Sequence, residues 1–115
     1  MKIYILIAAI LISPITVAKP IQPVSDKEHE SNCRFLMEAA YQIMENKQEG
    51  MSLREMLTRN DQANDLHPSD FLYESTQLII RDAFSQPETS DTKKQLNDFS
   101  AKYYLGCMEM YKSLY

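Results

Sequence analysis

Glycine, cysteine, histidine and tryptophan are all scarce in this chain of 115 residues, which contains two Gly, two Cys, two His and no Trp. So little glycine argues against an all-β fold with many tight turns and against a glycine-rich phosphate-binding loop. Two cysteines cannot form a four-cysteine zinc site, and only two histidines are available to supplement them. The net charge of −4 does not indicate a general nucleic-acid binder, and the length allows one domain.

The first 18 residues have the layout of a secretory signal peptide. Lys2 supplies a short positive region, Ile3–Ile12 form an unbroken apolar run, and Thr16–Ala18 approach the small-residue cleavage pattern. An uncleaved anchor is the alternative, but a membrane-spanning helix needs roughly 20 apolar residues. We therefore predict cleavage near Ala18 and a periplasmic or secreted protein with no stable membrane insertion after cleavage.

The sequence after residue 18 predicts an extended, proline-containing arm over 19–25 and one helical domain over 26–115. Good helix formers dominate the domain, and apolar residues recur at steps of three and four. Serine or aspartate stands at each expected helix start. Four helices are predicted: about 26–48, a short one after Ser52, one from Ser69 to Pro87, and one from Thr89–Asp91 to the C-terminus. Short connections make sequential helices antiparallel neighbours, so the predicted fold is an all-α bundle of about four helices.

The sequence also predicts where helices end and which of their residues face inward. Gly50 is a natural left-handed stop for the first helix, and residues 60–65, rich in Asn and Asp, predict a turn after a short second helix. The inward residues expected in that second helix are Leu53, Met56 and Leu57. In the third helix the helical spacing runs through Phe71, Leu72, Ser75, Leu78, Ile79, Asp82 and Ala83. In the last it runs through Leu96, Phe99, Tyr103, Cys107, Met110 and Leu114.

Cys33 and Cys107 fall on the apolar faces of the first and last helices, at the same end of an up-down bundle. At 1.5 Å per residue each lies about 10 Å from that end, which permits a disulfide without forcing one. An exported small domain with an even number of cysteines favours pairing, so we predict a structural disulfide. A redox-active pair is the alternative, although such pairs normally use the Cys-x-x-Cys spacing.

No catalytic constellation stands out. His29 and His67 are interpreted as solvated surface residues, since neither has an obvious orienting partner and no serine lies in a nucleophile motif. Asp61 and Asp65 lack the order and the central glycine of a calcium loop. The methionines fall mostly on apolar faces, which is more typical of core filling than of copper binding. The sequence thus predicts no catalytic residue, no metal and no cofactor.

The last helix is rich in tyrosine. Tyr103 fits its apolar stripe, but Tyr104, Tyr111 and Tyr115 cannot all do so. Exposed tyrosine on a rigid helix is typical of a protein interface, so these three form a possible interaction face. The alternative is that they cover the end of the bundle with their hydroxyls in water.

The chain also resembles small secreted two-cysteine helical proteins of proteobacteria and of their phages and prophages. The resemblance runs from about residue 33 to 107 and rests on a few short stretches: Cys33, Gly50–Leu53, Ala83–Pro87, and Phe99 with Tyr103 and Cys107. Phe84 stands where tyrosine is expected. The resemblance implies a periplasmic, disulfide-bonded helical domain. That family has no established activity, so no functional residue is carried over.

Three functions follow as hypotheses. The leading one is a non-enzymatic protein that acts through protein–protein interaction, with an envelope or phage protein as partner and with no nucleic acid. The second is a periplasmic chaperone that protects against stress or acid, since many carboxylates would be protonated at low pH. The third is an enzyme with an unrecognised site, which would need a polar pocket joining a histidine to carboxylates. The oligomeric state does not follow from the sequence.

Overall fold

The computed structural model describes residues 25–114, with side chains through Met110. It contains four α-helices, in the order α1 (Asp26–Gln48), α2 (Leu53–Leu66), α3 (Asp70–Ser85) and α4 (Thr92–Leu114). The predicted all-α fold with four helices is confirmed for this part of the chain. The predicted signal peptide over 1–18 and the arm as far as residue 24 lie outside the described residues.

Each helix begins at a short polar side chain that the sequence predicts. The hydroxyl oxygens of Ser25, Ser52 and Ser69 accept hydrogen bonds from backbone N–H groups three residues ahead, at 3.0, 3.1 and 3.2 Å. Asp91 does the same for α4, where its Oδ1 accepts from the Lys94 N–H at 3.1 Å. These bonds satisfy N–H groups that have no partner within the first turn of a helix.

α1 ends in the left-handed stop that Gly50 predicts. Gly50 has a φ of 103°, and its N–H donates to the Lys47 carbonyl at 3.0 Å. The Met51 N–H reaches back to the Asn46 carbonyl, also at 3.0 Å. This pair of bonds is the Schellman motif, which uses up the last free carbonyls of the helix and turns the chain towards α2.

The two glycines give a matched pair for a stability measurement. A Cβ built at either position meets no atom within 4 Å, but only Gly50 has a positive φ. Gly50→Ala is therefore expected to lower the free energy of unfolding by about 1–2 kcal/mol through backbone strain alone. Gly106→Ala, inside α4, is expected to raise it by about 0.5–1 kcal/mol. Urea unfolding of both variants checks this, and equal effects would contradict the assigned conformation.

α2 is longer than predicted, because residues 60–65 are helical rather than a turn. Two of their polar side chains form hydrogen bonds with Tyr73 of α3. The buried Asn60 donates to the Tyr73 carbonyl at 3.2 Å, and Asp61 accepts from the Tyr73 hydroxyl at 2.7 Å. Tertiary partners thus keep asparagine and aspartate in a helix that local propensity disfavours. Met56 is buried as expected, but Leu53 is exposed.

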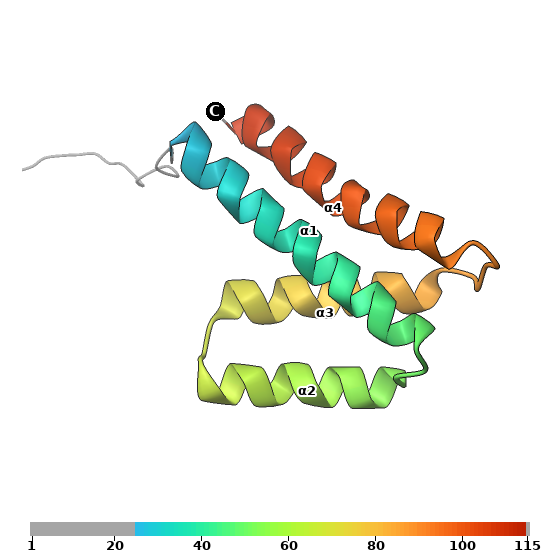
Figure 1. Ribbon diagram of the computed structural model, residues 1–115. Coiled ribbons are helices and arrows are strands. Elements are labelled where there is room, and N and C mark those ends of the chain that lie inside the picture. The colour runs from blue at the N-terminus through green and yellow to red at the C-terminus, as the bar shows by residue number, and fades with distance from the viewer. Residues whose placement is uncertain (1–24, 115) are drawn as a thin grey trace, which may run out of the picture.

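The helices form two antiparallel pairs that cross. Figure 1 shows α1 and α4 side by side, and α2 and α3 side by side, with α1 crossing α3. α1 makes its most extensive contacts with α4, while α3 packs on both α1 and α2. The prediction that sequential helices are neighbours therefore holds for α2 and α3, but the main partner of α1 is the last helix.

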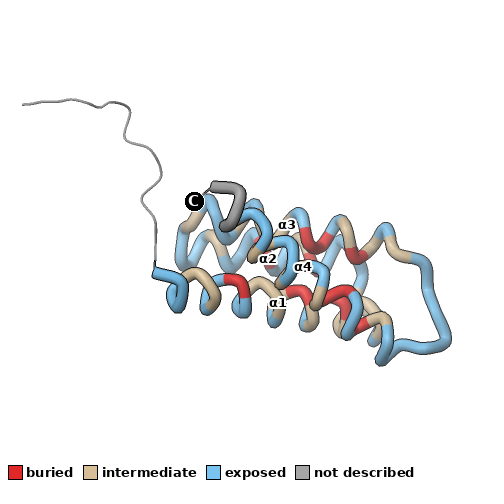
Figure 2. The backbone as a smooth tube through the Cα atoms, turned by 90° about the horizontal axis from the view of Figure 1, so that it is seen from above, coloured by how far each residue is buried: buried red, intermediate tan, exposed pale blue. Residues whose placement is uncertain are grey.

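The core lies where the two pairs meet, towards the C-terminal ends of α1 and α3 and the N-terminal half of α4. Figure 2 shows the buried residues concentrated over this part of the helices. The core cluster consists of Ala40, Ile43, Met44, Met56, Ile79, Ile80, Ala83, Leu96 and Phe99. Away from it, α1 and α4 diverge from α3 (Figure 1).

Lys47, in the last turn of α1, bonds to the end of α3. Its ammonium group donates to the carbonyl oxygens of Ala83 at 2.9 Å and Gln86 at 2.7 Å. These carbonyls lie at the C-terminal end of α3, where the helix dipole favours a cation. The lysine therefore holds α1 against the end of α3, and its ammonium group lies 5.7 Å from the centre of the Phe84 ring.

Candidate functional site

An apolar groove opens where α1 and α4 diverge from α3. Its volume is about 650 Å³, within the range of ligand-binding clefts. α1 contributes one wall, α3 a second and α4 the third. The lining residues include Leu36, Phe71, Leu78, Ile79, Tyr103 and Met110.

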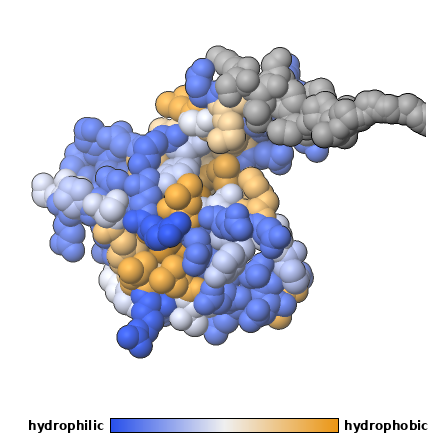
Figure 3. All heavy atoms as spheres, turned by 180° about the vertical axis from the view of Figure 1, so that it is seen from behind, coloured by the Kyte–Doolittle hydropathy of each residue, from blue (hydrophilic) through white to orange (hydrophobic). Residues whose placement is uncertain are grey.

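The apolar lining continues out of the groove onto its rim. Phe71 is 64% exposed, Leu78 56% and Met110 62%. All three fall on stripes that the sequence assigns to the apolar sides of their helices, so their exposure is a departure from a fully closed bundle. Figure 3 shows apolar side chains coming to the surface in a band between hydrophilic ones. Large apolar side chains that gather at one cleft are typical of a binding surface.

The polar end of the groove is organised around Asp82. One carboxylate oxygen accepts from the Tyr103 hydroxyl at 2.6 Å and from the Lys102 ammonium at 2.7 Å, and the other accepts from Gln86 at 3.0 Å. Partial burial raises the pKa of Asp82, but the hydrogen bonds from Lys102, Tyr103 and Gln86 outweigh it, and the net pKa is lowered. Burial and the hydrogen bond to Asp82 raise the pKa of Tyr103. Asp82 therefore stays a carboxylate and Tyr103 a phenol at neutral pH.

The lowered pKa of Asp82 predicts a pH dependence of stability. A carboxylate with a depressed folded-state pKa stabilises the fold above its unfolded pKa of about 3.9 and loses that contribution as the pH falls through the folded value. Asp82→Asn is expected to cost about 1 kcal/mol at pH 7 and to flatten the loss of stability below pH 4. Urea unfolding between pH 7 and pH 2.5 measures both effects. Asp98→Asn, at an exposed ion pair, is the control and should shift stability by only a few tenths of a kcal/mol.

Cys33 and Cys107 form the predicted disulfide between α1 and α4. Their sulfur atoms lie 2.08 Å apart and their Cα atoms 5.4 Å apart. Cys33 is fully buried, whereas Cys107 is half-buried and lines the groove. The bridge thus ties α1 to α4 near the divergent end, outside the core cluster.

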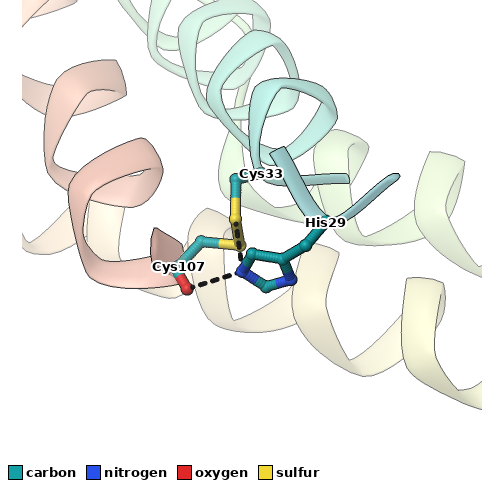
Figure 4. A group of neighbouring side chains, drawn as sticks. All are labelled: His29, Cys33 and Cys107. Carbon is teal, nitrogen blue, oxygen red and sulfur yellow. Dashed lines mark hydrogen bonds between the residues drawn. A yellow bond between two sulfur atoms is a disulfide. The ribbon is translucent and has the colours of Figure 1, made fainter. Parts of the chain in front are cut away.

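His29 lies against this disulfide, one helical turn before Cys33. Figure 4 shows the imidazole ring beside the bonded sulfurs, with one of its nitrogens facing Cys33 and Cys107. Its Nε2 lies 3.2 Å from the Cys33 sulfur and 3.2 Å from the Cys107 carbonyl oxygen. The interpretation of His29 as a solvated surface residue is therefore wrong, because the N-terminal turn of α1 packs on α4. His67, in the α2–α3 connection, is exposed as predicted.

The described tyrosines of α4 have different surroundings from those expected for the predicted interaction face. Tyr104 is half-buried, and its hydroxyl donates to Glu30 of α1 at 2.8 Å. This hydrogen bond raises the pKa of Tyr104. The pKa of Glu30 is lowered by its hydrogen bond from Arg34 and by the one from Tyr104. The side chain of Tyr111 and all of Tyr115 lie outside the described part of the chain. The face that includes Tyr104 therefore stays a prediction, while Tyr103 is the tyrosine that lines the groove.

A second, smaller hollow of about 340 Å³ lies beside the α3–α4 connection. Its lining is mainly exposed and polar, including Thr89, Asp91 and Lys94, and it resembles an ordinary surface depression. The groove is the better candidate for a binding site, because its lining is apolar and continuous with an exposed apolar rim.

Comparisons with family models, curated proteins and solved structures returned no match for the chain. The resemblance to small secreted two-cysteine proteins therefore stays a prediction. No helix within residues 25–114 is both long enough and apolar enough to cross a membrane.

Proposed function

We propose that this protein is a non-enzymatic interaction protein of the periplasm or extracellular space, which binds an amphipathic helix of a partner protein in its groove. The observation that carries the proposal is the exposed apolar lining formed by Phe71, Leu78 and Met110. An amphipathic helix that lays its apolar face into a hydrophobic groove is a recurrent mode of recognition. The disulfide supports an oxidising compartment, where an envelope or phage protein would be the partner.

The exposed rim favours a helix over a small apolar molecule. A small ligand enclosed in the groove would leave Phe71 and Met110 largely in water, because both project onto the rim. A helix along the groove would cover the floor and the rim together. Methionine at such a surface also adapts to the shape of a partner.

The charges beside the groove indicate the polar flanks of the partner helix. Asp70, Glu74 and Glu109 are exposed, and each directly precedes a lining residue of α3 or α4. Neighbouring residues are about 100° apart around a helix, so these carboxylates flank the groove rather than enter it. A partner helix with lysine or arginine beside its apolar face would complement them.

The test selects ligands from a display library of helix-forming peptides, using protein produced from the full chain. We expect selected peptides to share apolar residues at i, i+3 or i+4, and i+7, with basic residues beside them. Leu78→Asp should weaken their binding at least about tenfold, since it places a carboxylate in the apolar contact. Leu105→Asp is the matched control, because Leu105 is 63% exposed on α4 and does not line the groove.

Four outcomes would contradict the proposal. Binding that survives Leu78→Asp, or that is lost equally in Leu105→Asp, would place the site elsewhere. Equal binding of peptides with and without the apolar spacing would instead favour the chaperone hypothesis, which aggregation assays with client proteins at low pH would then examine. Turnover of a bound substrate would favour the enzyme hypothesis.

A further inference from the structure

We propose that the reduced form of the protein binds Zn²⁺ through His29, Cys33 and Cys107. One ligand atom from each residue, the imidazole nitrogen and the two sulfurs, lies within 4.8 Å of the others. Imidazole and thiolate are the two ligand types that zinc prefers in proteins. The oxidised protein cannot form this site, because both sulfurs are held in the disulfide.

The distance between His29 and the Cys33 sulfur is close to that of a tetrahedral site. With Zn–N of about 2.05 Å and Zn–S of about 2.3 Å, tetrahedral geometry places N and S about 3.5 Å apart and the two sulfurs about 3.8 Å apart. The His29 Nε2 already lies 3.2 Å from the Cys33 sulfur. The main change is the separation of the two sulfurs from 2.08 Å once the bond between them is broken. Side-chain rotation and a small shift between α1 and α4 would supply it.

The helices place the ligands in a suitable pattern. His29 and Cys33 are four residues apart on α1 and so lie on one face of the helix, the spacing that helical zinc sites use for two of their ligands. Cys107 comes from α4, which packs along α1. The ion would therefore join the same two helices, at the same point, as the disulfide does.

Formation of the site has a defined stoichiometry. A dithiol reductant supplies two electrons and two protons and itself becomes a disulfide. A phosphine supplies two electrons and takes the oxygen of a water molecule to become a phosphine oxide, while the two protons of that water complete the two thiols. Zn²⁺ then binds as both thiols lose their protons and His29 Nε2 exchanges its contact with the Cys107 carbonyl for the metal. Two thiolates balance the charge of the ion, which suits the burial of Cys33. Because His29 and Cys107 line the groove, solvent can take the fourth position.

The test measures binding of Co²⁺, a spectroscopic substitute for Zn²⁺, to protein that has been reduced with a phosphine. We expect thiolate-to-cobalt charge transfer and tetrahedral absorption bands, both removed by one equivalent of Zn²⁺. His29→Gln should weaken binding at least about tenfold, since even an outer-shell partner of a ligand is worth 10–100-fold. His67→Gln changes the other histidine, which is exposed, and should bind like the unaltered protein.

If the reduced chain loses structure, circular dichroism measures how much helicity Zn²⁺ restores. We then expect Zn²⁺ to restore helicity to the unaltered chain and to the His67→Gln variant, but less to the His29→Gln variant. Equal affinity of the unaltered chain and the His29→Gln variant would overturn the proposal, because it would show two thiols acting without the imidazole. Binding to the oxidised protein, or to a Cys33→Ala/Cys107→Ala variant, would place the metal elsewhere and also overturn it.

Discussion

Replacing Cys33 and Cys107 together by alanine is expected to lower the free energy of unfolding by up to about 4.5 kcal/mol. The disulfide closes a loop between residues 74 positions apart, and the loss of chain entropy in the unfolded state grows with that separation. A domain of this size is stable by only about 5–15 kcal/mol, so the bridge supplies a large share of the total. The double substitution also avoids leaving one buried thiol alone.

Urea unfolding of the double variant and of the oxidised protein measures the difference. The second comparison is the unaltered protein in a phosphine reductant, with zinc removed by a chelator. It should unfold at about the same urea concentration as the double variant. A loss below about 1 kcal/mol would contradict the expectation. It would mean that contacts between α1 and α4 already constrain the unfolded chain, or that strain in the bridge offsets its entropic effect.

The sequence predicts most of the fold because its helix boundaries are local. Ser25, Ser52 and Ser69 cap the helices they were expected to cap, and Gly50 ends α1 with a positive φ. Each of these signals depends on a few neighbouring residues and their hydrogen bonds. The boundary that was wrong, the end of α2, depends instead on contacts of Asn60 and Asp61 with Tyr73 on α3.

The groove could not be predicted in the same way. Helical spacing identifies an apolar stripe but does not say whether another helix covers it. Phe71 and Met110 lie on such stripes and are exposed because α1 and α4 diverge from α3 at that end. The angle between the helix pairs is set by how their side chains interdigitate, which a single stripe does not specify.

The position of His29 illustrates the same limit. Its spacing of four residues from Cys33 places both on one face of α1, and this signal was present in the sequence. The sequence also predicted that Cys107 pairs with Cys33, but it did not supply the packing of the first turn of α1 on α4, which places the Cys107 carbonyl oxygen 3.2 Å from the ring. A predicted disulfide between Cys33 and Cys107 therefore predicts that the residue one turn before Cys33 lies beside it.

Ile80 and Leu78 are expected to differ strongly when each is changed to alanine, although helical spacing favours Leu78 as the inward residue. Ile80 is 1% exposed in the core cluster, whereas Leu78 is 56% exposed in the groove. α3 packs on α1 and on α2, so it buries a wider arc than one stripe, and Ile80 falls within that arc. Ile80→Ala should cost about 2–5 kcal/mol, because it removes apolar contacts and leaves a cavity.

Leu78→Ala should cost less than about 1 kcal/mol, since most of that side chain is already in water. Urea unfolding of the two variants, with far-ultraviolet circular dichroism as the signal, measures the difference directly. Equal losses would mean that the groove is closed in solution and that α3 approaches α1 and α4 along its whole length. A large difference, together with loss of peptide binding in Leu78→Asp, would separate the residues that hold this fold together from those that act on a partner.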